Sequence, residues 1–187
     1  MLTETELDPY FDALRTEAFR VEALPAYAVS SESSGLRTYL AGEPYQKSEA
    51  GQAFKDYIRS QVEAGITWHR VRVVCGPLSD YERWECEWGY TVNEDLGYPT
   101  FVLDLSETAD PPELPDYDWW MLDERVVLRF HYDGNGAFLG ADLLDEPDQI
   151  AGHRHYRDAA LAAAVPFPQY WAAHPQYWRE NWLRMRT

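Results

Sequence analysis

The sequence predicts an α/β fold in which a single mixed β-sheet is flanked by helices. Segments with apolar residues three and four positions apart alternate with short β-branched segments, the pattern of helices and strands that cover a mixed sheet. The stretch Asp133 to Gly136, Asp-Gly-Asn-Gly, separates two strand segments, and Gly and Asn tolerate the positive φ of a hairpin turn. No segment is long enough to be a linker, so residues 1–164 are expected to form one domain, followed by an aromatic helical C-terminal tail at 165–187.

In the first half of the chain, helical periodicity is the clearest pattern. Phe11, Leu14, Ala18 and Val21 recur at spacings of three and four, which predicts a helix over residues 3–22. Turn residues and β-branched runs divide the rest. The predicted elements are, in order, a short strand at 25–29, a small helix closed by Gly42, a surface loop at 42–51, a helix closed by Gly65, a strand at 71–75, and a helix opened by Ser79.

The second half of the chain is richer in strands. Pro147 suits the first turn of a helix, because proline lacks the amide hydrogen that this position leaves unpaired. The predicted elements are, in order, a strand at 100–105, a proline-rich loop at 109–115, strands at 119–122, 126–132 and 137–144, and a helix from Pro147 to about Ala164.

Composition limits the classes of partner. The 187 residues include 32 acidic and 16 basic ones, for a formal net charge of -16. Nucleic acids and anionic membranes attract proteins through Lys and Arg, so direct binding to either is not expected. No apolar run reaches the length of a membrane span, no secretory signal is recognisable, and Cys75 and Cys86 are expected to be reduced thiols. These features favour a cytoplasmic protein.

Residues 52–164 resemble one half of a phospholipase D-like domain. The likeness lies in a helix and strand ending in "EAGITWHRVRVV", the hairpin "WWMLDERVVLRF", and a closing helix after "LLDEPDQI". The catalytic signature of that superfamily is His, any residue, Lys, four residues, Asp, and its three positions fall on Asp116, Asp118 and Asp123. The superfamily's His attacks phosphorus and its Lys holds the phosphoryl oxygens, and a carboxylate at each of these places removes that nucleophile and that cation together. Two like charges about 4 Å apart cost about 4 kcal/mol at an effective dielectric constant of about 20, so phosphodiester cleavage is not expected.

A second resemblance covers residues 8–171. The segments "EAFRVEALPAYAV", "RVRVVCGPLSDYERWECEWGY" and "YRDAALAAAVPFPQY" are similar to an uncharacterised actinobacterial family usually encoded beside Xre-type helix-turn-helix regulators. This resemblance implies a regulatory neighbourhood and no particular activity. Together with the missing catalytic signature, it favours a non-enzymatic accessory or regulatory protein that acts by protein–protein binding. A helix-turn-helix regulator is the partner that it implies, and a homodimer is a further alternative. No catalytic residue, metal ligand or cofactor motif is predicted.

Acidic and aromatic residues are the candidate binding residues of the main domain. Large amphipathic rings suit interfaces as well as cores. The candidates are Asp116, Asp118, Asp123, Tyr81, Trp84, Trp88, Trp119 and Trp120. Two alternatives remain open: a divergent enzyme whose aspartates hold a divalent ion against a phosphorylated substrate, and a small-molecule sensor with a tryptophan-rich cleft.

The C-terminal tail repeats "PQYW" at 168–171 and 175–178. Each proline is expected to open a short helix that presents Tyr and Trp. The candidate interface residues are Tyr170, Trp171, Tyr177, Trp178 and Trp182. Packing of the tail on its own domain is favoured over docking on another subunit, because so many exposed rings would promote aggregation.

Overall fold

A mixed β-sheet forms the centre of the computed structural model, which describes residues 1–30 and 32–185, without the side chains of 183–185. Within these residues its strands are β1 (Glu17–Glu22), β2 (Thr67–Val74), β3 (Thr100–Asp104), β4 (Trp119–Leu122), β5 (Val126–Tyr132), β6 (Phe138–Leu144) and β7 (Val165–Pro166). Their order is β6-β5-β4-β1-β2-β3-β7. β1, β2 and β3 run parallel to one another, while the other pairings are antiparallel. The predicted fold class is confirmed.

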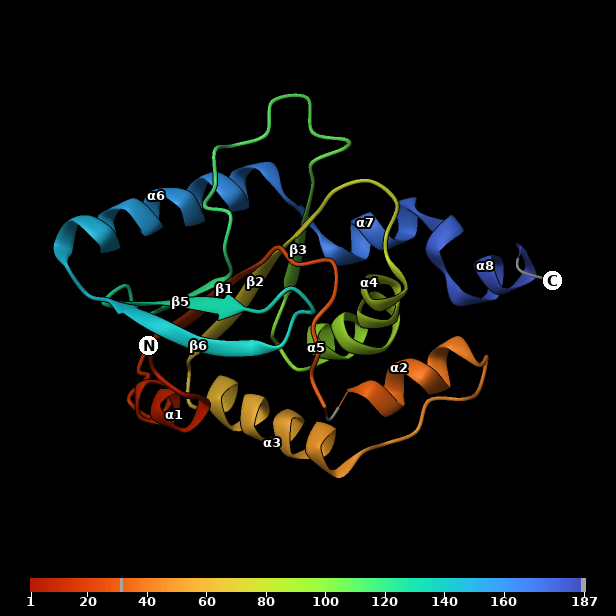
Figure 1. Cartoon of the computed structure of the whole chain (residues 1–187), viewed down its shortest axis with the longest axis horizontal. Coiled ribbons are helices and arrows are strands. Elements are labelled where there is room, and N and C mark those ends of the chain that lie inside the picture. Colours follow the sequence, from red (N-terminus) through yellow and green to blue (C-terminus); the bar gives the residue numbers. More distant parts are fainter. Residues whose placement is uncertain (31, 186–187) are drawn as a thin grey trace.

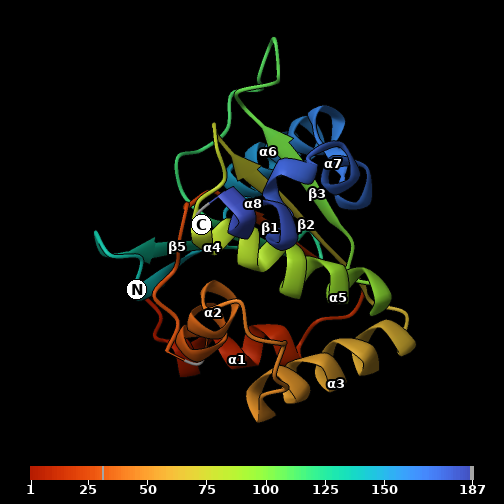
Figure 2. The same cartoon turned by 90° about the vertical axis from the view of Figure 1, so that its right-hand side faces the viewer.

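Helices cover both faces of this sheet (Figure 1). They are α1 (Glu4–Asp12), α2 (Ser33–Leu40), α3 (Glu49–Glu63), α4 (Asp80–Trp84), the π-helix η1 (Glu85–Tyr90), α5 (Thr91–Asp95), α6 (Pro147–Ala163), α7 (Phe167–Ala173), the 3₁₀-helix η2 (Pro175–Tyr177) and α8 (Arg179–Met185). α6 lies on one face, and α1, α2 and α3 lie on the other (Figures 1 and 2). None of the helices in the described part of the chain has the length and apolarity needed to cross a membrane.

The two faces of the sheet have separate apolar cores. Successive side chains of a strand point to opposite faces, and the neighbours Trp119 and Trp120 of β4 show this directly. Trp119 packs with Phe19, Val71 and Ala160 on the face covered by α6. Trp120 packs in a different cluster, under α1 and α3. The second face therefore carries the core that continues into the site described below.

The predicted helix over residues 3–22 is wrong beyond α1, because residues 17–22 form β1. Buried Ala18, Phe19 and Val21 stand at spacings that suit either element, so periodicity alone was ambiguous. The predicted strand at 25–29 is also wrong. Its residues pair with no strand of the sheet, although the amide of Ala28 donates to the carbonyl of Gly136, 2.9 Å away.

Most other predicted elements are confirmed with shifts of a few residues. α3 begins at Glu49 and β2 at Thr67, each earlier than the sequence suggested. The capping box of Ser79 and Glu82 opens a helical run that continues through the π-helix to Asp95. A hairpin joins β5 and β6 as predicted.

The C-terminal tail packs on its own domain. β7 pairs with β3, so residues 165 and 166 belong to the central sheet. Phe167 and Tyr170 are buried against the helical run after Ser79, and Trp182 is 4% exposed. The indole of Trp182 donates to the hydroxyl of Tyr39 in α2, 3.3 Å away.

Candidate functional site

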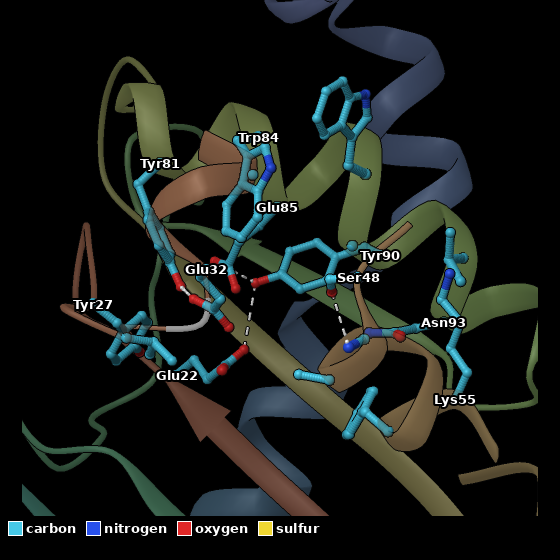
Figure 3. Close-up of a pocket in the computed structure, with 18 of the residues that line it drawn as sticks. Glu22, Tyr27, Glu32, Ser48, Lys55, Tyr81, Trp84, Glu85, Tyr90 and Asn93 are labelled. Carbon is cyan, nitrogen blue, oxygen red and sulfur yellow. Dashed lines mark hydrogen bonds between the residues drawn. The ribbon is translucent and has the colours of Figure 1, made fainter. Parts of the chain in front are cut away.

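A cavity of about 720 Å³ opens between the sheet and the helices α1, α2, α3 and α4–η1 (Figure 3). This volume is in the range of sites for small organic ligands. Aromatic rings form much of its lining, including Tyr27, Tyr81, Trp84, Trp88, Trp120 and Tyr132. The cavity lies over one face of the sheet, where Arg20 and Glu22 of β1, Arg70 of β2 and Trp120 of β4 line it.

Charged side chains form the floor of this cleft. Arg20 and Glu22 of β1 stand beside Arg70 and Arg72 of β2, because the register pairs them directly. Glu22 is 2% exposed and receives ion-pair contacts of 2.8 Å from both Arg20 and Arg70. Burial would raise the pKa of the Glu22 carboxyl, but the three guanidinium groups lower it to about 2. Glu22 is therefore held as a carboxylate.

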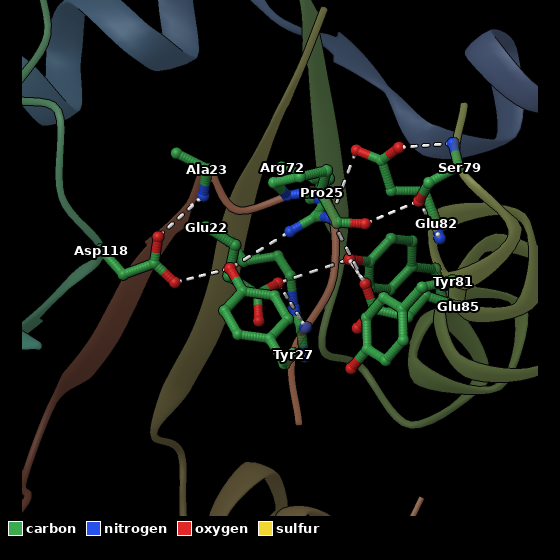
Figure 4. Close-up of polar contacts among 12 residues, drawn as sticks. Glu22, Ala23, Pro25, Tyr27, Arg72, Ser79, Tyr81, Glu82, Glu85 and Asp118 are labelled. Atoms are coloured by element: carbon green, nitrogen blue, oxygen red, sulfur yellow. Dashed lines mark hydrogen bonds and ion pairs between the residues drawn. The ribbon is translucent and has the colours of Figure 1, made fainter. Parts of the chain in front are cut away.

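Arg72 joins the floor to the helical wall. Its guanidinium donates to the hydroxyl of Tyr27 at 3.2 Å and lies 3.3 Å from Glu82 and 3.7 Å from Glu85 (Figure 4). Tyr27 in turn donates to Asp118 at 2.5 Å. Burial raises the pKa of the Tyr27 hydroxyl, so this phenol is a neutral link between an arginine and a carboxyl group.

The π-helix η1 places Glu85 and Tyr90 on the same side. The two residues are five apart, which in an α-helix would separate their side chains by about 140°. In η1 the hydroxyl of Tyr90 lies 3.0 Å from Glu85 and 3.4 Å from Glu22. π-Helical turns are rare and occur frequently at functional sites.

Carboxyl groups outnumber guanidinium groups in this cluster. The carboxyl groups are Glu22, Glu32, Glu82, Glu85 and Asp118, and the guanidinium groups are Arg20, Arg70 and Arg72. Burial raises the pKa of Glu85 to about 7, although Arg72 opposes the shift. Burial also raises the pKa of Glu32, which accepts a 2.6 Å hydrogen bond from Tyr81, and the pKa of Asp118.

The three predicted aspartates do not form one site. Asp116 is exposed, and Asp118 accepts from the amide of Ala23, beyond the end of β1. Asp123, at the opposite end of β4, accepts from backbone amides where β1 begins. Among residues 1–30 and 32–185, no group of three or more His, Cys, Asp or Glu side chains is placed to hold a metal ion.

Four of the five predicted aromatic residues come together. Tyr81, Trp84, Trp88 and Trp120 line the cleft. Trp119 lies on the opposite face of the sheet and is fully buried.

The predicted tail residues pack beside the cleft rather than in it. Tyr170 donates to Asp104 at 3.0 Å, Tyr177 stacks on His174, and the indole of Trp178 donates to the carbonyl of Trp171. Trp182 contacts Tyr39, whose ring meets the cleft residue Trp88 at 5.2 Å between centroids. The tail therefore supports the cleft wall from behind.

Several residues of the site were not recognised from the sequence. They are Arg20, Glu22, Glu32, Arg70, Arg72 and Glu85. A pattern was present in both strands, since "FRVE" and "HRVRVV" carry charged residues at every second position between apolar ones. Such alternation on strands inside a sheet places charge on a buried face, where it requires partners.

Comparison with known proteins gives a family and no activity. Residues 5–172 match the family model described as domain of unknown function (DUF6879). No curated protein matches the sequence.

Proposed function

Since the chain belongs to the DUF6879 family, we propose a function from its cleft: the protein binds a small organic molecule there and acts as a sensor. The observation that carries the proposal is the aromatic cavity of about 720 Å³ over a floor of buried, paired charges. A large pocket with a few convergent polar groups is the usual form of a ligand site. Groups with shifted pKa values, here Glu22 and Glu85, also gather at functional sites.

The role is proposed to be binding without catalysis. The resemblance to phospholipase D-like domains places Asp116, Asp118 and Asp123 at the signature positions. The carboxyl groups of Asp118 and Asp123 accept hydrogen bonds from backbone amides. The three aspartates supply neither the histidine nucleophile nor the lysine cation of that signature. Asp118 and Asp123 lie at opposite ends of β4, so they do not converge on a common metal ion.

We propose that the sensor passes its signal on by binding a protein partner. The resemblance to proteins encoded beside helix-turn-helix regulators supports such a partner, and so does the net charge of -16, which would attract a basic protein surface. The test is co-purification of this protein with the regulator encoded beside it, in a cytoplasmic extract and with purified components. Absence of a complex at micromolar concentrations of both would contradict this route of signalling.

Indole NMR tests ligand binding itself. The ¹⁵N-labelled protein is titrated with neutral, anionic and cationic small molecules, and its indole resonances are assigned by single Trp→Phe variants. A ligand in the cleft is expected to shift the resonances of Trp84 and Trp88, which line it. The resonance of Trp119, on the other face of the sheet, is the internal control. If no compound shifts Trp84 or Trp88 at millimolar concentration, the proposed function is wrong.

A further inference from the structure

We infer that the molecule taken by the cleft is a small organic cation, an ammonium ion with apolar substituents that contacts Tyr81, Trp84, Glu32 and Glu85. This inference rests on the proposed function, since it names the chemical class of the ligand. Three observations carry it: the charge left over in the cluster, the arrangement of the rings, and the separation of the carboxyl groups.

The first observation is the distribution of ion pairs. Glu22 takes both Arg20 and Arg70, each at 2.8 Å. Arg72 is shared by Glu82 and Glu85, at 3.3 and 3.7 Å. Glu32 has the hydroxyl of Tyr81 as its hydrogen-bond partner. Three guanidinium groups therefore stand against four carboxyl groups. The carboxyl group without an arginine is Glu32 on the wall, and its neighbour Glu85 has only a share of Arg72.

The second observation is a curved aromatic wall beside those two carboxyl groups. Neighbouring rings in the series Tyr132, Tyr27, Tyr81, Trp84 have centroids 5.3, 5.8 and 5.3 Å apart and planes inclined by 62°, 61° and 60°. Arg20 and Arg72 already lie over the ring of Tyr27. Within the described residues, no cationic side chain lies over the ring of Tyr81 or Trp84. The negative face of an aromatic ring attracts a cation, and the attraction strengthens as water is excluded.

The third observation distinguishes an organic cation from a metal ion. Figure 3 shows Glu22, Glu32 and Glu85 turned toward one another, with the rings of Tyr81 and Tyr90 beside them. Tyrosine hydroxyls stand between these carboxyl groups, at 2.6 Å from Glu32 and 3.0 Å from Glu85. A metal ion needs its ligand oxygens about 2–2.6 Å away on all sides, whereas an ammonium ion accepts dispersed carboxylates and ring faces.

Proton release is expected to accompany binding of the cation. Burial raises the pKa of Glu85 to about 7, so near neutral pH about half of the empty molecules carry a proton there, and a bound cation would replace it. The groups that face Glu85 are Arg70 and Arg72 of β2, Glu22 of β1, Glu32 before α2, and Tyr90 of η1. Affinity for the cation is therefore expected to rise about tenfold between pH 6 and pH 8.

The test compares choline with its uncharged isostere 3,3-dimethylbutan-1-ol, and benzyltrimethylammonium with benzoate. Affinities are read from the indole resonances of Trp84 and Trp88 in the full chain. We expect each ammonium ion to bind at least tenfold more tightly than its comparator. E32Q and E85Q are each expected to weaken ammonium binding about tenfold without weakening binding of the alcohol. E113Q, in the exposed loop after β3, is the matched control and is expected to change nothing.

The outcomes separate the two proposals. If the alcohol or benzoate binds as tightly as the ammonium ions, the cation inference is wrong and small-molecule binding stands. If none of the probes and none of the wider compound set shifts Trp84 or Trp88, both proposals fall. An unchanged Trp119 resonance shows that each variant is folded. If E85Q does not fold, the cation inference is tested with E32Q alone. E32Q is expected to fold, because Glu32 has no arginine within ion-pair distance among the described residues and an amide can still accept from Tyr81.

Discussion

The hydroxyl of Tyr90 lies 3.0 Å from Glu85 and 3.4 Å from Glu22, so one phenol bridges two carboxyl groups. A phenol has one proton and cannot donate to both. A proton on Glu85 completes the chain, because Glu85 then donates to Tyr90 and Tyr90 donates to Glu22. The ionisation of Glu85 is thereby linked to the packing of η1 on β1.

This relationship predicts a pH-dependent contribution of Glu85 to stability. Burial raises its pKa in the folded protein from 4.5 to about 7. The stabilising contribution of such an acid is complete below the unfolded pKa and is lost as pH rises through the folded one. Relative to the wild type, E85Q is expected to gain about 1–3 kcal/mol in free energy of unfolding between pH 4.5 and pH 8. Urea unfolding at intervals of half a pH unit measures this, with E113Q as control. A constant difference between E85Q and wild type would contradict the shift.

Glu22 is expected to be far more sensitive than Glu32 to loss of charge. E22Q leaves Arg20 and Arg70 buried without their carboxylate, and removing one partner of a buried ion pair costs about 3–5 kcal/mol. E32Q leaves an amide oxygen that still accepts from Tyr81, so it is expected to cost less than about 1 kcal/mol. Chemical denaturation of both variants at pH 7 provides the comparison. Equal costs would mean that Glu22 is not the main partner of the two arginines.

The same cluster explains how much of the structure the sequence could predict. The apolar strands β4 and β5 and the helix α6 follow from hydrophobic pattern and turn residues, which act locally. β1 did not, because its buried Ala18 and Val21 also continue the helical spacing of Phe11 and Leu14. Its charged residue Glu22 is acceptable inside the protein only because it pairs with Arg20 and, across the sheet, with Arg70.

The candidate site was predicted in part for the same reason. Aromatic residues such as Tyr81 and Trp84 are common in binding sites, so the sequence alone could indicate them as candidates, and both line the cleft. The pairing of Glu85 with Tyr90 depends on a π-helical turn, for which the sequence carries no recognisable pattern. Trp119 and Trp120 are neighbours on β4 and face opposite sides of the sheet. The sequence does not show which of the two faces the cleft.

Gly136 is expected to control the segment that carries Tyr27. Its φ is +83°, and an added Cβ would lie 2.6 Å from the carbonyl oxygen of Ala26. Its own carbonyl accepts the amide of Ala28. G136A is therefore expected to lower stability by about 1–3 kcal/mol, through the left-handed backbone and the clash. G134A is the matched control in the same turn, because a Cβ there meets nothing within 4 Å. A G136A loss no larger than that of G134A, in thermal unfolding, would contradict this.

Trp182 is expected to stabilise the cleft wall from outside. It packs on Tyr39 and lies under the guanidinium of Arg83. W182A removes a buried ring, a change that costs about 3–5 kcal/mol in a core and less at an edge. We expect a loss of about 2–4 kcal/mol and a shifted indole resonance of Trp88, which touches Tyr39. F54A, at a side chain that is 43% exposed, is the control for loss of a ring. An unmoved Trp88 resonance in W182A would show that the tail does not support the cleft.

Asp123 is expected to act through the backbone and not through a ligand. It lies with Glu124, each at φ of 53°, in the three-residue turn between β4 and β5, and its carboxylate accepts hydrogen bonds from the amides of Arg15, Thr16 and Glu17. Loss of a comparable side-chain cap costs about 0.5–2 kcal/mol, and Ala at positive φ costs about 1 more. D123A is therefore expected to lose about 1–3 kcal/mol, and D123N about half of that, because Asn tolerates the turn and keeps one acceptor.

The pH dependence of the wild type provides a second, independent measure of Asp123. Although partial burial opposes the change, hydrogen bonds from the Glu17 and Thr16 amides lower the pKa of its carboxyl below 3.8. The stabilisation is therefore complete above that pH and is lost as the pH falls through the lowered value. D123N is expected to approach the wild type in stability as pH falls from 5 to 2, while D116N, at an exposed position of the same sequence motif, matches the wild type throughout. If D123N matched the wild type at pH 7 as well, the amide contacts would contribute nothing to folding, and a ligand-binding role for Asp123 would again be the better explanation for its place in the chain.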